Sequence, residues 1–151
     1  MNHAALLIIG ALLMVGSTML NTPRGIRNNN PGNLRITNNA WKGKLPPELN
    51  TDGAFEQFSS PELGIRALYI DLRSKINRGL NTISKIMTVY APPNENNTRA
   101  YIEYIENVSG INRDRQLSET EIPALIPPII KMENGTQPYT DTQFKVAYSL
   151  V

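Results

Sequence analysis

The sequence predicts a mainly α-helical domain with a small β region (α+β), placed after an N-terminal transmembrane helix. Three observations lead to this prediction. An uncharged apolar run opens the chain, short strand-like segments alternate with turns between residues 34 and 58, and apolar residues repeat at helical spacing from residue 60 onward. We place the boundary so that residues 1–22 form the anchor and residues 23–151 form the domain.

The anchor is predicted from residues 4–20, which begin at Ala4 and end at Leu20 and contain no charged side chain. A bilayer span needs roughly 17 apolar residues or more, so this run is just long enough. A cleaved signal peptide is an alternative, although few positive charges precede the run. A buried core helix is a second alternative. An uncleaved span would place the domain beside a lipid membrane.

Residues 21–60 contain few signals for regular structure. Residues 21–33 are rich in Pro, Gly and Asn, which predicts an irregular loop. Short strands are expected at residues 34–37, 41–43 and 54–58, joined by turns. These three segments make up the predicted β region.

Helices are expected in the remainder of the chain. Ser60, Pro61 and Glu62 are typical of a helix start, and Gly79 of its end. Four further helices follow, at residues 82–90, 98–108 and 121–133 and from residue 140 to the C-terminus. In the third of these, Pro127 and Pro128 are expected to kink or restart the helix.

The composition excludes several kinds of chemistry. The 151 residues include no cysteine and a single histidine, His3, so a disulfide, a thiolate or zinc site and a Ser-His-Asp triad are not expected. We therefore expect no metal and no cofactor. The net charge of +2 suits an anionic polymer, but the basic residues form no stripe with aromatics, so nucleic acid is not an expected partner. The 17 asparagines suit carbohydrate hydrogen bonding.

Glu133 is the best candidate for an acid catalyst. Cleavage of a glycosidic bond needs a carboxyl group that is still protonated near neutral pH. Glu133 ends an apolar segment, where burial and the negative end of a helix both disfavour its ionised form, and Gly135 permits a sharp exit turn. A solvated carboxylate at a helix end is the simpler interpretation of this spacing. Among the aromatics, Trp41 and Tyr139 are candidates for stacking on sugar rings.

Several motifs in a fixed order resemble a known family. They are residues 27–35 (RNNNPGNLR), 41–43 (WKG), 55–68 (FEQFSSPELGIRAL), 81–83 (NTI), 90–98 (YAPPNENNT) and 132–135 (MENG). Together they resemble the muralytic structural proteins of membrane-containing phages and their prophage relatives, over residues 24–151. That family is similar to lytic transglycosylases and to the lysozyme-like superfamily. The order of the motifs here implies a circularly permuted lysozyme-like domain.

The resemblance implies roles for particular residues. Glu133 would be the catalytic acid, and Tyr90 would support the oxocarbenium-like state. Asn29, Asn30 and Asn33 would line the substrate groove, with Trp41 and Tyr139 as further substrate-binding residues. The implied reaction is cleavage of the bond between N-acetylmuramic acid and N-acetylglucosamine, with a 1,6-anhydro ring closing in place of attack by water.

The resemblance also implies a location and partners. The protein would be a membrane-anchored virion enzyme that degrades bacterial peptidoglycan during phage genome entry or host lysis. It would lie in the virion membrane, or in the host inner membrane with its domain directed to the periplasm, and other virion proteins are further expected partners. Two alternatives stay open at this point. One is a non-enzymatic virion membrane protein that binds the cell wall, and the other is a peptidoglycan endopeptidase.

Overall fold

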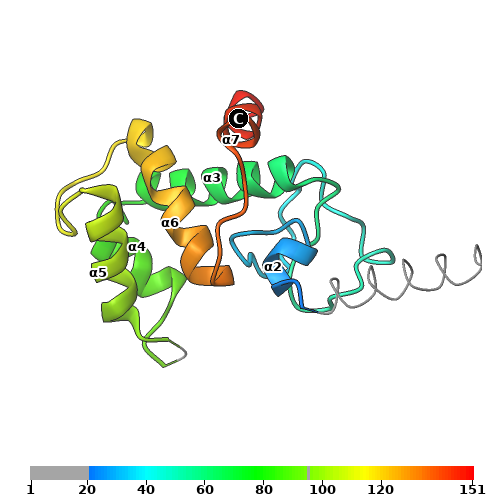
Figure 1. Cartoon of the computed structure of the whole chain (residues 1–151), viewed down its shortest axis with the longest axis horizontal. Coiled ribbons are helices and arrows are strands. Elements are labelled where there is room, and N and C mark those ends of the chain that lie inside the picture. Colours follow the sequence, from blue (N-terminus) through cyan, green and yellow to red (C-terminus); the bar gives the residue numbers. More distant parts are fainter. Residues whose placement is uncertain (1–20, 95) are drawn as a thin grey trace, which may run out of the picture.

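The computed structural model describes residues 21–94 and 96–151, and these residues form a helical fold (Figure 1). Its elements, in chain order, are α2 (Arg24–Arg27), α3 (Pro61–Asn77), α4 (Ile83–Tyr90), α5 (Thr98–Ser109), the 3-10 helix η1 (Glu119–Glu121), α6 (Ile122–Asn134) and α7 (Asp141–Ser149). Helices α4, α5 and α6 gather on one side of the molecule and residues 21–60 on the other, while α3 extends along both (Figure 1).

Local sequence signals set most of the helix boundaries. The Ser60 side chain accepts a hydrogen bond from the Leu63 N–H, and Pro61 occupies the first helical position of α3. Thr82 and Asn97 cap α4 and α5 in the same way. A capping box at Thr140 opens α7. The helices expected after residue 60 are thus confirmed, with boundaries that move by one or two residues.

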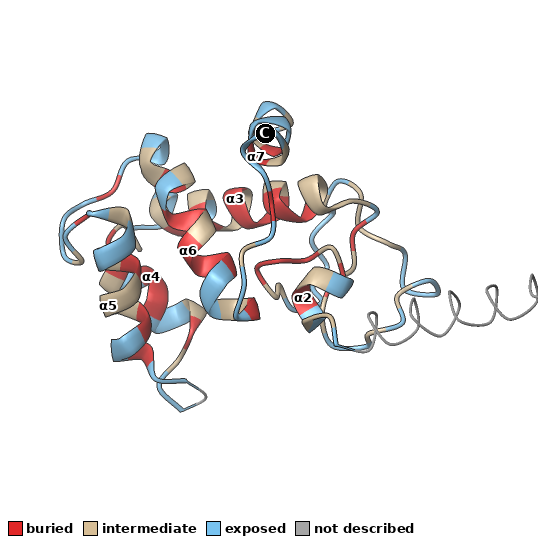
Figure 2. Cartoon of the chain, viewed as in Figure 1, coloured by how far each residue is buried: buried red, intermediate tan, exposed pale blue. Residues whose placement is uncertain are grey.

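The core lies where α3, α4, α5 and α6 face one another. Figure 2 shows buried residues on the inward sides of these helices. The largest fully buried side chains of the core are Ile65, Leu68, Leu72, Ile83, Ile86, Met87, Ile105, Ile122, Leu125, Ile126, Ile129 and Ile130. Burial of such side chains contributes about 1.5–3 kcal/mol each. Helix α6 supplies five of them, so its position and that of Glu133 at its end are fixed by packing.

Helix α6 continues through both of its internal prolines, so the expected restart is wrong. Pro127 and Pro128 cannot donate to the carbonyl groups four residues earlier, those of Pro123 and Ala124. Ala124 is exposed, so water can satisfy its carbonyl group. Pro128 is itself buried on the apolar face of the helix, and this burial offsets the cost of the missing hydrogen bond.

The predicted β region is wrong, and with it the α+β, lysozyme-like fold class. Between residues 21 and 60 the structure has two isolated antiparallel bridges, Arg35 with Phe55 and Lys44 with Phe58, and no strand. Side-chain amides take hydrogen bonds that a neighbouring strand would otherwise make. Asn30 Nδ2 donates to the Leu34 and Glu56 carbonyls, both at 2.9 Å. These residues form an extended loop without a sheet.

Two further expectations concern the N-terminal part of the chain. The loop predicted for residues 21–33 contains the short helix α2, with Gly25 buried. Within residues 21–94 and 96–151, no helix has the length and apolar character needed to cross a membrane. The anchor expected at residues 4–20 lies outside the described residues. The transmembrane helix of the predicted fold class therefore has no counterpart in the part of the chain that the structure describes.

Candidate active site

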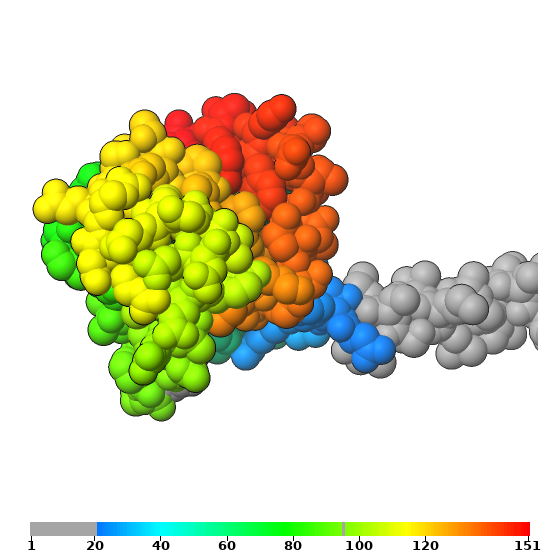
Figure 3. Space-filling model, turned by 60° about the vertical axis from the view of Figure 1, so that its left-hand side comes forward, coloured from blue at the N-terminus to red at the C-terminus, as the bar shows by residue number. Residues whose placement is uncertain are grey.

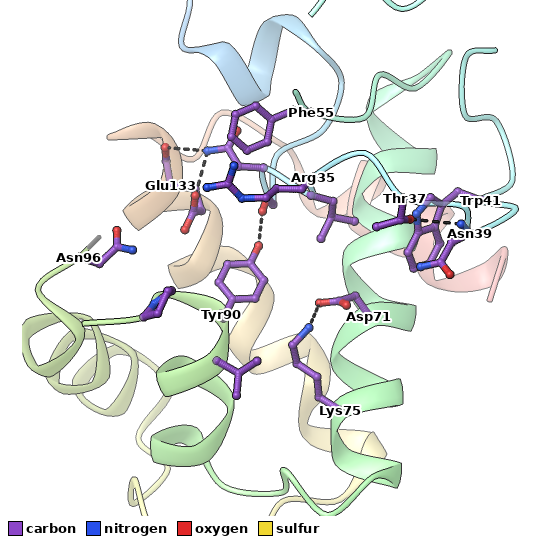
Figure 4. Close-up of a pocket in the computed structure, with 15 residues that line it drawn as sticks. Arg35, Thr37, Asn39, Trp41, Phe55, Asp71, Lys75, Tyr90, Asn96 and Glu133 are labelled. Carbon is purple, nitrogen blue, oxygen red and sulfur yellow. Dashed lines mark hydrogen bonds and ion pairs between the residues drawn. The ribbon is translucent and has the colours of Figure 1, made fainter. Parts of the chain in front are cut away.

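A cavity of about 450 Å³ lies between the loop of residues 32–55, helices α3 and α4, and the end of α6 (Figure 4). Most of its lining is polar, with amides, hydroxyls and four charged side chains. The lining residues are Gly32, Asn33, Leu34, Arg35, Thr37, Asn39, Trp41, Phe55, Asp71, Lys75, Val89, Tyr90, Pro92, Asn96 and Glu133. A cavity of this size and polarity suits a sugar or a similar polar ring.

Glu133 projects from the end of α6 into this cavity. Its Oε1 accepts a hydrogen bond from the Tyr101 hydroxyl, and its Oε2 accepts one from Asn33 Nδ2, each at 2.9 Å. Burial raises the pKa of Glu133, whereas the two hydrogen bonds act in the opposite direction. The nearby Lys131 ammonium donates to the Gly135 carbonyl at 2.7 Å. Glu133 is therefore a mostly buried acid whose two oxygens are both oriented.

Asn134, the residue after Glu133, bonds the end of α6 to the asparagine-rich loop of residues 28–33. Asn134 Nδ2 donates to the Pro31 carbonyl at 2.8 Å and to the Ile130 carbonyl at 2.9 Å. The space-filling view shows the end of α6, in orange, directly against the N-terminal loop, in blue (Figure 3). Gly135 follows with a φ of 69°, which lets the chain leave the helix sharply. The backbone directly after Glu133 is thus held against the loop by Asn134.

Gly25 in α2 packs directly behind the asparagines that hold this end of α6. A Cβ atom at this position would lie 2.4 Å from Asn134 Oδ1 and 2.7 Å from Asn33 Oδ1. Both oxygens are buried and have no hydrogen-bond donor among the described residues. Only glycine allows this approach, so α2 controls where both asparagines lie.

Two tyrosines stand beside the acid. The ring centroids of Tyr90 and Tyr101 are 6.5 Å apart in an edge-on arrangement. The Tyr90 hydroxyl donates to the Gly32 carbonyl. Burial, followed by nearby negative charge, raises the pKa of Tyr90 well above its usual value, and burial is also the main cause of the raised pKa of Tyr101. Both hydroxyls therefore remain protonated and act as donors.

The structure brings four of the seven candidate site residues to the cavity. Glu133, Asn33, Trp41 and Tyr90 all line it. Trp41 and Glu133 lie at opposite sides of the cavity, with Tyr90 between them (Figure 4). The indole N–H of Trp41 is buried and has no acceptor among the described residues. Residues far apart in the sequence therefore converge on this cavity.

The other three candidates do not line the cavity. Asn29 Nδ2 donates to the Phe58 carbonyl at 3.0 Å. Asn30 is fully buried, and its side chain bonds the backbone of the loop. Tyr139 is buried and packs edge-on against Phe144, with 6.3 Å between ring centroids. Asn29 and Asn30 shape the loop, and Tyr139 belongs to the core. The structure gives no support to a direct substrate contact for these three residues.

Sequence reasoning missed the roles of Tyr101, Asp71 and Lys75. The helical spacing of Tyr101 predicts a core residue, yet its hydroxyl bonds Glu133. Asp71 and Lys75 look like an ordinary ion pair on a solvated helix face. A signal was nevertheless present, because each follows a buried leucine, Leu68 or Leu72, by three residues and so lies on the inward face of α3.

No protein-family model matches the chain. Among the described residues, no group of three or more His, Cys, Asp or Glu side chains is arranged to hold a metal ion. The chain is 40% identical over 129 residues to "Protein P5" of Pseudoalteromonas phage PM2, an alignment that covers 83% of this chain and 79% of that protein. The expected relationship to a phage protein is thereby confirmed, while the muralytic part of the resemblance stays a prediction. The chain belongs to the family of Protein P5 of Pseudoalteromonas phage PM2.

Proposed function

We propose that this protein is a virion-associated enzyme that cleaves the glycan strands of bacterial peptidoglycan, with Glu133 as its acid. Relationship to a phage protein supports the virion association. The observation that carries the enzymatic part is the Glu133 carboxyl group on the wall of a polar cavity, with both of its oxygens oriented by hydrogen bonds and its pKa raised by burial. Carboxyl groups that are kept protonated by burial are the usual acids of glycosidic cleavage.

The surroundings of Glu133 suit a group that first gives and then takes a proton. Burial favours the protonated acid, which can donate to the glycosidic oxygen between N-acetylmuramic acid and N-acetylglucosamine. After that transfer, the donors Tyr101 and Asn33 stabilise the resulting carboxylate. The carboxylate can then accept the proton of the muramic C6 hydroxyl as that oxygen attacks the anomeric carbon. The products carry a 1,6-anhydro ring, and no water is consumed.

Tyr90 contributes by position in this mechanism. Its hydroxyl is bonded to the Gly32 carbonyl, and its ring borders the cavity beside Glu133. The ring therefore supplies a fixed wall against which the sugar undergoing reaction can be placed. Amide side chains of Asn39 and Asn96 are available to bond neutral sugar substituents.

The test compares the full-length chain with its Glu133→Gln variant on purified peptidoglycan, with soluble products identified by mass spectrometry. The amide introduced by this substitution can accept from Asn33 and donate to Tyr101, so the variant should fold. A matched control is Glu48→Gln, the same chemical change at an exposed loop position. We expect products lighter by one water than hydrolytic ones from the wild type and from the control, and none from Glu133→Gln.

Other outcomes would contradict the proposal in different ways. Hydrolytic glycan products would retain Glu133 as the acid but exclude anhydro-ring closure. Free stem peptides would indicate an endopeptidase. Binding to the wall without release of products by any variant would indicate a non-enzymatic wall-binding protein.

A further inference from the structure

The cavity wall also carries a pair of charged side chains that has no role in the proposed mechanism. Asp71 and Lys75, one turn apart on α3, form an ion pair with Lys75 Nζ 2.5 Å from Asp71 Oδ2. Their side chains are only 20% and 10% exposed, and both line the cavity. Figure 4 shows the pair across the cavity from Glu133, with the Tyr90 ring near Lys75. The Lys75 ammonium lies 5.6 Å from the centre of that ring.

Stability of the fold does not account for this pair. The cost of removing two charges from water commonly matches or exceeds their attraction, and apolar residues of similar size often stabilise a protein equally well. Arg99 and Glu103 on α5 provide a comparison, because they have the same spacing but are 86% and 43% exposed. An ion pair of that kind is the ordinary surface form. The pair on α3 instead faces a cavity that a ligand can enter.

The hydrogen-bonding capacity of the pair is largely unused. Among the described residues, the bond between Asp71 and Lys75 takes one of three ammonium protons and one of two carboxylate oxygens. Acceptor and donor therefore lie side by side at the cavity wall. A sugar hydroxyl both donates and accepts, so two neighbouring hydroxyls on one ring match this arrangement.

We propose that Asp71 and Lys75 form a sugar-binding subsite that bonds neighbouring hydroxyl groups of a pyranose ring next to the bond presented to Glu133. This inference rests on the proposed function, because it takes the ligand to be a glycan. The pair has no net charge, so it favours a neutral ring over an anion or a cation. The neutral side chains of Thr37, Asn39 and Asn96 elsewhere on the cavity wall agree with that choice.

The experiment measures binding apart from cleavage. The full-length Glu133→Gln protein is titrated calorimetrically with a soluble, uncharged N-acetylglucosamine oligomer. The same titration follows for the added double change Asp71→Leu/Lys75→Met, which replaces the pair by apolar side chains. We expect affinity to fall about tenfold or more, as for loss of hydrogen bonds to charged groups, while the melting temperature is unchanged or higher. Arg99→Met/Glu103→Leu is the matched control and should bind as the parent does.

Equal affinity in the apolar double variant would overturn the subsite. If that variant does not fold, Asp71→Asn/Lys75→Gln replaces it, with weaker binding expected and unchanged binding refuting the proposal. The wild-type peptidoglycan assay distinguishes failure of the subsite from failure of the proposed function. Cleavage by the wild type together with unchanged oligomer affinity in the double variant would refute the subsite alone. Neither cleavage nor oligomer binding by any form would refute the proposed function and the subsite with it.

Discussion

Gly25→Ala is the sharpest test of how the acid is positioned. The new Cβ atom would lie 2.4 Å from Asn134 Oδ1, whereas ordinary contact begins near 3.4 Å. Asn134 would therefore have to withdraw by about 1 Å, and its bonds to the Pro31 and Ile130 carbonyls would be lost or lengthened. Asn33 Oδ1, at 2.7 Å, would have to move as well, and Asn33 is a hydrogen-bond donor to Glu133.

The size of the effect follows from three contributions. Overpacking a filled site costs about 1–3 kcal/mol, and each lost hydrogen bond costs about 1 kcal/mol. Replacing glycine by alanine in a helix stabilises the helix by about 1 kcal/mol, which reduces the net cost. We expect a net loss of about 2 kcal/mol, which lowers the melting temperature of a domain of this size by roughly 4–8 °C. Glycan cleavage should fall by more than the unfolded fraction explains, because Glu133 loses its orientation.

A double-mutant cycle isolates the contact. Thermal unfolding is measured for Gly25→Ala, for Asn134→Ala and for both changes together. Because Asn134→Ala removes the nearest obstacle, Gly25→Ala should cost about 1 kcal/mol less in that background. Additive costs, or a Gly25→Ala protein as stable as the wild type, would refute the argument that α2 controls the end of α6.

Three further predictions concern ionisable and hydroxyl groups. Tyr101→Phe removes the donor to Glu133 and should cost about 1–3 kcal/mol in urea unfolding at pH 7; an unchanged midpoint would contradict the bond. Glu133→Gln should gain stability relative to the wild type as pH rises above about 4.5, because the raised pKa of Glu133 makes the folded state favour the protonated form; parallel melting temperatures from pH 4 to 8 would show otherwise. Asp52, bonded by Arg24, has a lowered pKa, so its stabilisation is present above about pH 3.8 and lost as the solution becomes more acidic. Asp52→Asn should therefore be less stable than the wild type at pH 7 and show a smaller loss of stability in acid.

Helices were predictable because their signals are local. Ser60 followed by Pro61, and Thr140 with a glutamine three residues later, each specify a helix start without reference to the rest of the chain. Strands were not predictable in the same way, because an alternating segment becomes a strand only if a partner segment lies alongside. Between residues 34 and 58 the amide side chains of Asn30 and Asn50 take backbone partners instead, so the segments stay as loops.

The candidate acid could be proposed from sequence because its position at the end of an apolar helix is itself a local feature. Its partners could not be identified that way. Whether Tyr101 presents its hydroxyl to Glu133 or to solvent depends on how α5 packs on α6. The pairing of Asp71 with Lys75 is visible in the sequence, but its burial depends on the loop that closes the cavity above α3.

The contacts at Glu133 also determine when during synthesis the site can exist. The bond from Asn33 to Glu133 joins residues 100 positions apart, and that from Asn134 to Pro31 joins residues 103 positions apart. The ribosome therefore releases the loop, both tyrosines and the charged pair on α3 well before the acid. A chain that stops anywhere before α6 has most of the cavity wall but no carboxyl group in this position. Competence for the proposed reaction thus requires that α6 has been synthesised, and products truncated before α6 lack the proposed acid.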